Sequence, residues 1–138
     1  MKLPPRRVLR SIVQDAISDR EEMEDPEIRD RTLAQLAGYR DFLPRLSDNA
    51  PPLSAEDRKL LVTACMHARI WRAGYAEAWA GTGDLAVIQK AKQDVARIDR
   101  TEEALGVATP FIIGGKDPAG MYSIDVFSLL AQHRAEAA

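Results

Sequence analysis

Residues 54–80 read SAEDRKLLVTACMHARIWRAGYAEAWA, a run long enough for about seven turns of α-helix. Ser54 stands at a helix N-cap position, and Asp57 follows where the acidic residue of a capping box stands. The run contains no proline and a single glycine. It therefore predicts one long helix from Ser54 to Ala80.

Successive residues of a helix lie about 100° apart, and this spacing gives the predicted helix two opposed apolar faces. One broad face carries Leu60, Leu61, Ala64, Ala68, Trp71, Tyr75, Ala78 and Trp79. The opposite face carries Val62, Met66, Ile70, Ala73 and Ala80. A surface helix needs only one apolar stripe, so a helix with two must be covered on both sides. The cover comes from its own domain, from another copy of the chain, or from a partner.

A second helix is predicted from Asp84 to about Leu105, after a break at Gly81-Thr82-Gly83. Its apolar positions are Ile88, Ala91, Val95, Ile98 and Leu105. They recur in steps of three and four, as on the broad face of the preceding helix. A short connection between two such helices predicts an antiparallel hairpin over 54–105. Glu102 interrupts the second stripe, so we expect that end of the hairpin to open toward water.

The first 43 residues predict a pair of helices. Pro4-Pro5 opens the first helix, and Asp25-Pro26-Glu27 begins the second, which ends before Pro44. Three prolines in residues 44–53 predict a loop. A Gly/Pro-rich loop and a short helix are expected within 107–135. The sequence thus predicts an all-α fold, a single helical domain over 1–138 with an N-terminal pair (5–43) and a central hairpin (54–105).

Composition narrows the class of protein further. The chain has 138 residues, a net charge of −2 and one cysteine, so an intrachain disulfide is excluded. The N-terminus lacks the apolar stretch of a secretory signal, and no run is long enough to cross a bilayer. We therefore expect a cytoplasmic protein, in a bacterium or a virus-infected host cell, with no membrane partner.

Charge is unevenly distributed along the chain. Lys2, Arg6, Arg7 and Arg10 form a basic end that could contact nucleic-acid phosphate, although a solvated helix end has the same pattern. Three arginines, Arg58, Arg69 and Arg72, share one flank of the long helix. For these we favour salt bridges to acidic residues of the first two helices over a nucleic-acid site.

Patterns for catalysis or metal binding are missing. Cys65 and His67 are two residues apart on a predicted helix, so they point in different directions; we expect a core cysteine beside a flank histidine. Gly114-Gly115-Lys116 lacks the spacing of a phosphate loop. We expect no catalytic residue, no metal site and no cofactor. A small metal-dependent hydrolase using Glu21, Glu22 and Asp25 is only the third-ranked hypothesis. A magnesium site needs carboxylates from several helices around one cavity, whereas these three bunch at one helix end and the next turn.

The hairpin carries a family resemblance. The stretch Leu53-Ser-Ala-Glu-Asp57-Arg-Lys-Leu-Leu61, an Ala/aromatic-rich helix, a break, and a second helix ending Glu103-Ala-Leu-Gly-Val-Ala-Thr-Pro110 resemble the small terminase subunits of tailed phages. The similar region is residues 53–110. The resemblance implies a ring-forming, non-enzymatic component that recognises DNA and delivers it to the large packaging subunit. It also implies phosphate contacts by the basic N-terminal residues.

Two leading functions follow. The first is an oligomeric assembly protein of this kind, with one face of the long helix packed between copies. The second is a helical adaptor for a protein partner, with no nucleic-acid role. In either case the expected oligomer or partner interface comprises Val62, Met66, Ile70, Ala73, Phe111, Ile112 and Ile113.

Overall fold

The structure, a computed structural model, describes residues 2–80 and 85–107, without the side chains of residues 73–80, 85, 88, 91 and 92. Every regular element in these ranges is helical, which confirms the all-α prediction. The helices are α1 (Arg6–Glu21), α2 (Arg29–Phe42), α3 (Ala55–Ala80) and α4 (Leu85–Ala104), with 3-10 turns at Pro26–Ile28 and Leu43–Leu46. The predicted loop and helix of 107–135 lie almost wholly outside the described residues. Within the described ranges, no helix has the length and apolarity needed to cross a membrane.

Two predicted capping residues are confirmed by their hydrogen bonds. The Ser54 hydroxyl accepts from the amide of Asp57 at 3.1 Å, and Asp25 Oδ1 accepts from the amide of Glu27 at 3.0 Å. Asp57 does not reach back as a capping-box residue would, because Arg45 binds its carboxylate at 2.9 Å. The residues after Asp25 first form a 3-10 turn, so α2 begins only at Arg29. The predicted loop of 44–53 also begins with a 3-10 turn that includes Pro44. The predicted break at 81–83 and the helix start at Asp84 lie outside the described residues.

The end of α4 is fixed by a glycine. Gly106 has φ +79°, a left-handed conformation that costs glycine little. The amide of Val107 donates to the carbonyl of Glu102 at 3.0 Å, and that of Gly106 donates to Glu103 at 3.1 Å. These two bonds form a Schellman motif, so the predicted helix stop is confirmed.

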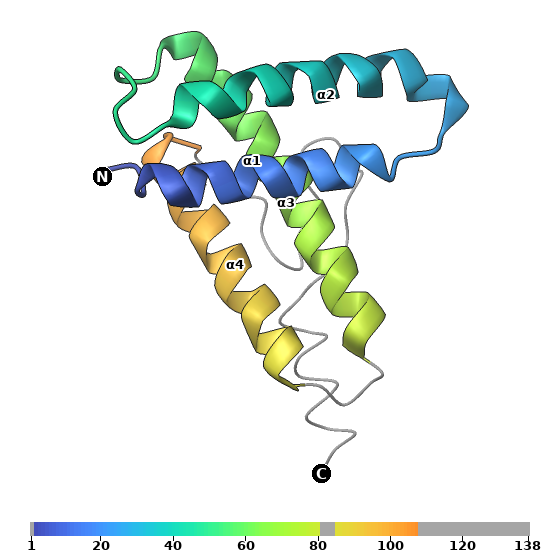
Figure 1. The fold of residues 1–138 in the computed structure, drawn as a ribbon. Helices are drawn as coiled ribbons and strands as arrows, with labels where there is room; N and C mark the ends of the chain where they lie inside the picture. Colours follow the sequence, from blue (N-terminus) through green and yellow to red (C-terminus); the bar gives the residue numbers. More distant parts are fainter. Residues whose placement is uncertain (1, 81–84, 108–138) are drawn as a thin grey trace.

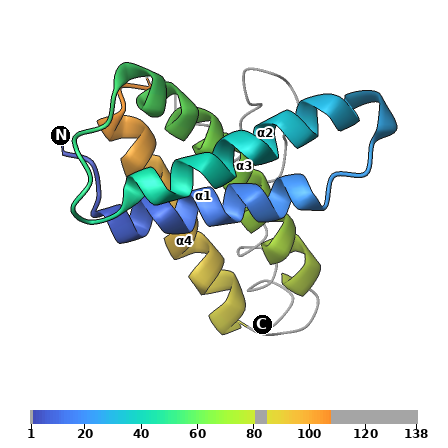
Figure 2. The same cartoon turned by 45° about the horizontal axis from the view of Figure 1, so that its top comes forward.

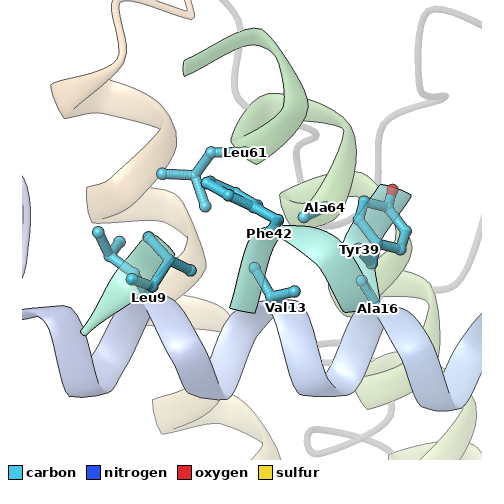
Figure 3. Packing of buried hydrophobic residues seen from close by; sticks show 8 residues of the cluster. Leu9, Val13, Ala16, Tyr39, Phe42, Leu61 and Ala64 are labelled. Carbon is cyan, nitrogen blue, oxygen red and sulfur yellow. The ribbon is translucent and has the colours of Figure 1, made fainter. Parts of the chain in front are cut away.

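Helix α1 lies across the hairpin that α3 and α4 form, and α2 packs alongside α1 (Figures 1 and 2). The main core joins three helices and the second 3-10 turn: Leu9, Val13, Ala16, Tyr39, Phe42, Leu46, Leu61 and Ala64 (Figure 3). The Leu61–Ala64 part of the α3 face therefore packs on α1 and α2. The matching stripe of α4 contributes Ile98, which packs with Ile12, Cys65 and Ala68 in a second cluster. The N-terminal helices thus cover a face that the hairpin alone was expected to bury.

The seam between α3 and α4 is partly ionic. Arg69 of α3 is 3% exposed and binds Asp99 at 2.6 Å and Glu102 at 2.5 Å on α4. Glu102 itself is fully buried. The expectation that Glu102 opens this end of the hairpin to water is wrong, because the arginine opposite supplies a charge partner and makes burial of the carboxylate tolerable.

Candidate functional site: a basic groove

A groove of about 540 Å³ lies where the start of the chain meets the last turns of α4. Both views show the N-terminus beside that end of α4 (Figures 1 and 2). We call this groove the basic groove. It is lined by Lys2, Pro4, Pro5, Arg7, Val8, Ser11, Arg97 and Arg100. Four of these residues are cations, and within the described part of the chain no carboxylate lines the groove.

The first turn of α1 forms one wall of the groove. Pro5 precedes the helix, and its carbonyl accepts from the amide of Val8 at 2.9 Å. Among the described residues no side chain caps α1. The amides of Arg6 and Arg7 therefore lie at the positive end of the helix dipole without intrahelical acceptors. This local field adds to the charge of the Arg7 side chain.

The last turns of α4 form the opposite wall. Arg97 and Arg100 are three residues apart, so they lie on the same side of the helix. Both are exposed. Arg97 also lies 3.7 Å from Asp94, a carboxylate that is largely buried and already pairs with Lys90 and Arg72. At that distance Asp94 holds Arg97 only loosely, and the guanidinium remains able to bind an anion.

The four predicted phosphate contacts separate into two pairs. Lys2 and Arg7 line the basic groove. Arg6 instead donates to the carbonyls of Arg45 and Pro51, at 3.2 and 2.9 Å. Similarly, Arg10 binds the carbonyl of Leu46 at 2.9 Å and the carboxylate of Asp48 at 3.1 Å. In the structure Arg6 and Arg10 hold the 45–51 loop against α1.

Sequence reasoning missed Arg97 and Arg100. They lie among acidic and neutral residues of α4, and nothing in that local pattern distinguishes them from an ordinary solvated face. Their relevance depends on α1 lying across α4, which brings the N-terminal cations to them. Basic residues near the end of the predicted 84–105 helix include Arg97 and Arg100. The sequence does not show that these two meet the N-terminal cations.

The arginines of the long helix are mostly used inside the fold. Arg72 binds both carboxylate oxygens of Asp15 on α1, at 2.8 and 2.9 Å, as the salt-bridge interpretation expected. Burial nevertheless raises the pKa of Asp15, with the Arg72 hydrogen bonds opposing that rise. Arg69 binds Asp99 and Glu102 of α4, whereas partners on the first two helices were expected. Arg58 is exposed, and its guanidinium lies 3.5 Å from the carbonyl of Ala104.

His67 was expected on a flank of the long helix, and the structure places it in the interior. It is 1% exposed, and its Nδ1 lies 2.6 Å from the hydroxyl of Tyr39 on α2. Burial, together with the nearby Arg20 charge, lowers the pKa of His67 to about 4. Cys65 is a core residue, as predicted, and burial raises its pKa, which keeps the thiol protonated at neutral pH.

The carboxylates of the hydrolase hypothesis are exposed. Glu21 lies 3.7 Å from Arg40, and Asp25 caps the following 3-10 turn, while Glu22 is the C-cap residue after α1. In the described ranges, no three His, Cys, Asp or Glu side chains gather closely enough to hold a metal ion.

The predicted interface residues are placed only in part. Val62, Met66 and Ile70 of α3 are half-buried. Ala73 belongs to α3, but its side chain is outside the described set, and Phe111, Ile112 and Ile113 lie beyond residue 107. Their role as an interface stays a prediction.

Comparison with protein-family models, with curated proteins and with solved structures finds no match for this chain.

Proposed function

We propose that this chain is a non-enzymatic nucleic-acid-binding protein that holds backbone phosphates in the basic groove. The observation that carries the proposal is the meeting of Lys2 and Arg7 with Arg97 and Arg100 around one hollow. Four exposed cations without a carboxylate among the described lining make a local positive field on a chain whose net charge is −2. Such a field attracts phosphate even when the whole molecule is acidic.

The chemistry of the lining suits phosphate oxygens. Arginine presents a planar fork of N–H donors that matches two oxygens of one phosphate, and lysine adds a mobile point charge. The amide of Arg7, a lining residue at the uncapped start of α1, offers a further donor. Each phosphate that these cations neutralise releases counterions, so binding should weaken as salt rises.

The assembly role is the second part of the proposal. The resemblance to small terminase subunits supports a homo-oligomer that recognises DNA and presents it to a large packaging subunit. The half-buried residues Val62, Met66 and Ile70 supply partly apolar surface on α3 for contact between copies. A helical adaptor that uses the same surface for a protein partner is the second candidate function.

The direct test replaces Arg97 and Arg100 by alanine and measures binding of a fluorescent oligonucleotide by anisotropy. Loss of two exposed charge contacts should weaken binding about tenfold at low salt, or about 1.4 kcal/mol. The slope of log K against log salt should become shallower by about 1.4 to 1.8, depending on whether the strand is single or double.

A matched control is Arg31→Ala with Arg40→Ala. Both arginines are exposed on α2, and the change in net charge is the same. The control should keep almost full affinity. Equal losses in the two double variants would mean that only total charge matters, and the basic groove would then not be the site. Unchanged binding in the Arg97/Arg100 variant contradicts the proposal outright.

A further inference from the structure

The basic groove is a hollow and not a flat patch. Its volume of about 540 Å³ falls within the range of sites that enclose small organic molecules, about 300 to 1,000 Å³. A double helix carries its phosphates on the outside of a stiff rod, so it can touch only the rim of such a hollow. A single strand bends freely and can place one nucleotide inside.

The composition of the walls agrees with a nucleotide better than with a phosphate alone. Besides the cations, the lining includes Pro4, Pro5 and Val8, whose side chains are apolar. Apolar side chains add nothing to phosphate binding, but they can cover the flat face of a base or the carbon side of a sugar. The face of every base is apolar and polarisable, so this contact tolerates any sequence.

The groove offers little means of reading base edges. Among its described lining residues, the side chains that can hydrogen-bond are Ser11 and the four cations. The asparagine, glutamine and carboxylate side chains that pair with adenine or cytosine are absent from this described lining. Arginine and lysine also pair with the O6 and N7 of guanine, so any base preference should be for guanine. The choice between a single and a double strand should depend on strand flexibility.

We infer that the basic groove takes one nucleotide of a single-stranded polynucleotide. Its phosphate lies among Arg7, Arg97 and Arg100, and its base or sugar lies against the Pro4, Pro5 and Val8 side. The protein then binds a single strand more tightly than a duplex of equal length. This inference rests on the nucleic-acid-binding part of the proposed function and narrows its ligand class; it does not depend on the DNA-packaging role.

The test compares labelled oligo-dT of about 12 nucleotides with a duplex of the same length, in the same low-salt buffer, by anisotropy. The single strand should bind several-fold more tightly, although the duplex carries more charge. Oligo-rU in a third arm shows whether the ribose hydroxyl matters; a preference for either single strand over the duplex supports the inference.

A charge-neutral variant separates the apolar wall from the cations. Pro4→Ser removes a ring from the groove and leaves Pro5 to precede α1. It should reduce single-strand affinity a few-fold and leave duplex affinity unchanged. Pro52→Ser, at an exposed position of the 44–53 loop, is the control and should change neither.

The two claims fail in different ways. If the duplex binds as tightly as the single strand, and Arg97→Ala with Arg100→Ala weakens both, the inference is overturned and the proposed function stands. If neither nucleic acid binds, or the arginine variant has no effect, the proposed function fails as well.

Discussion

The contact between His67 and Tyr39 joins α3 to α2 inside the core. Both residues are nearly or fully buried, and the 2.6 Å separation fits a hydrogen bond between the hydroxyl and the imidazole Nδ1. Buried Arg20 of α1 adds a repulsive positive charge to any proton on the ring. Asp19, also largely buried, pairs with that arginine at 2.7 Å. The imidazole is therefore held neutral.

Acid should destabilise the fold through His67. The unfolded histidine has a pKa of about 6.5 and the folded one of about 4, so the unfolded state takes up the proton first. The free energy of unfolding should fall as pH drops from about 6.5 to about 4, by at most about 3 kcal/mol, and this loss should level off below that.

Urea unfolding of the wild type and of His67→Gln across this pH range measures the effect. The carboxylates titrate in both proteins, so the difference between the two free energies isolates the histidine. That difference should shrink toward acid pH. A difference that is constant from pH 7 to pH 4 would show that the ring is protonated in the fold at little cost.

Residues whose role is local were predictable from the sequence. Ser54, Asp25 and Gly106 act through bonds between residues two to five positions apart, so each bond lies within a short stretch of sequence. His67 acts through a tyrosine 28 positions away in the chain. Its burial depends on which helix covers that side of α3, and helical spacing alone does not contain that information.

Helix α3 shows the same contrast at the scale of the element. Its extent was predicted correctly. Its predicted apolar positions Leu61, Ala64 and Ala68 are buried. What covers them was predicted only in part, because α1 provides much of the packing for Leu61 and Ala64. Glu102 was misread for a related reason. The apolar periodicity of α4 marks Glu102 only as an interruption of the apolar stripe. The sequence pattern does not show that Glu102 pairs with Arg69, which lies 33 positions away on α3.

The opposite side of α3 carries the prediction of assembly. Val62 and Met66 are half-buried, so the described helices cover them only partly. Contact between copies would remove the rest of their apolar surface from water. We expect light scattering to give a mass above the 15.3 kDa of one chain. The double variant Val62→Lys with Met66→Lys should be monomeric with unchanged helix content, because a solvent-facing helix surface accommodates lysine readily.

A wild-type protein that stays monomeric at micromolar concentration would contradict assembly through α3. That result would not bear on the proposed phosphate site, because residues of a single chain form the basic groove. An oligomer that survives the double lysine variant would place the contact elsewhere.

At the scale of the whole molecule, the basic groove exists because the fold brings distant segments together. Lys2 and Arg7 come from the start of the chain, and Arg97 and Arg100 come from the end of α4. The sequence indicated a basic N-terminus but assigned Arg6 and Arg10 to it, and these two hold the 45–51 loop. Only the crossing of α1 over the hairpin selects which cations share a surface.

The most direct measurement of that claim is an amide NMR titration of the whole chain with unlabelled oligo-dT at low salt. We predict that shift changes gather in residues 2–11 and 94–104 together, with equal midpoints, because both segments form one site. Residues 29–41 of α2, which contain Arg29, Arg31 and Arg40, should change little. Changes confined to α2, or present in only one of the two groove segments, would contradict a phosphate site shared by α1 and α4.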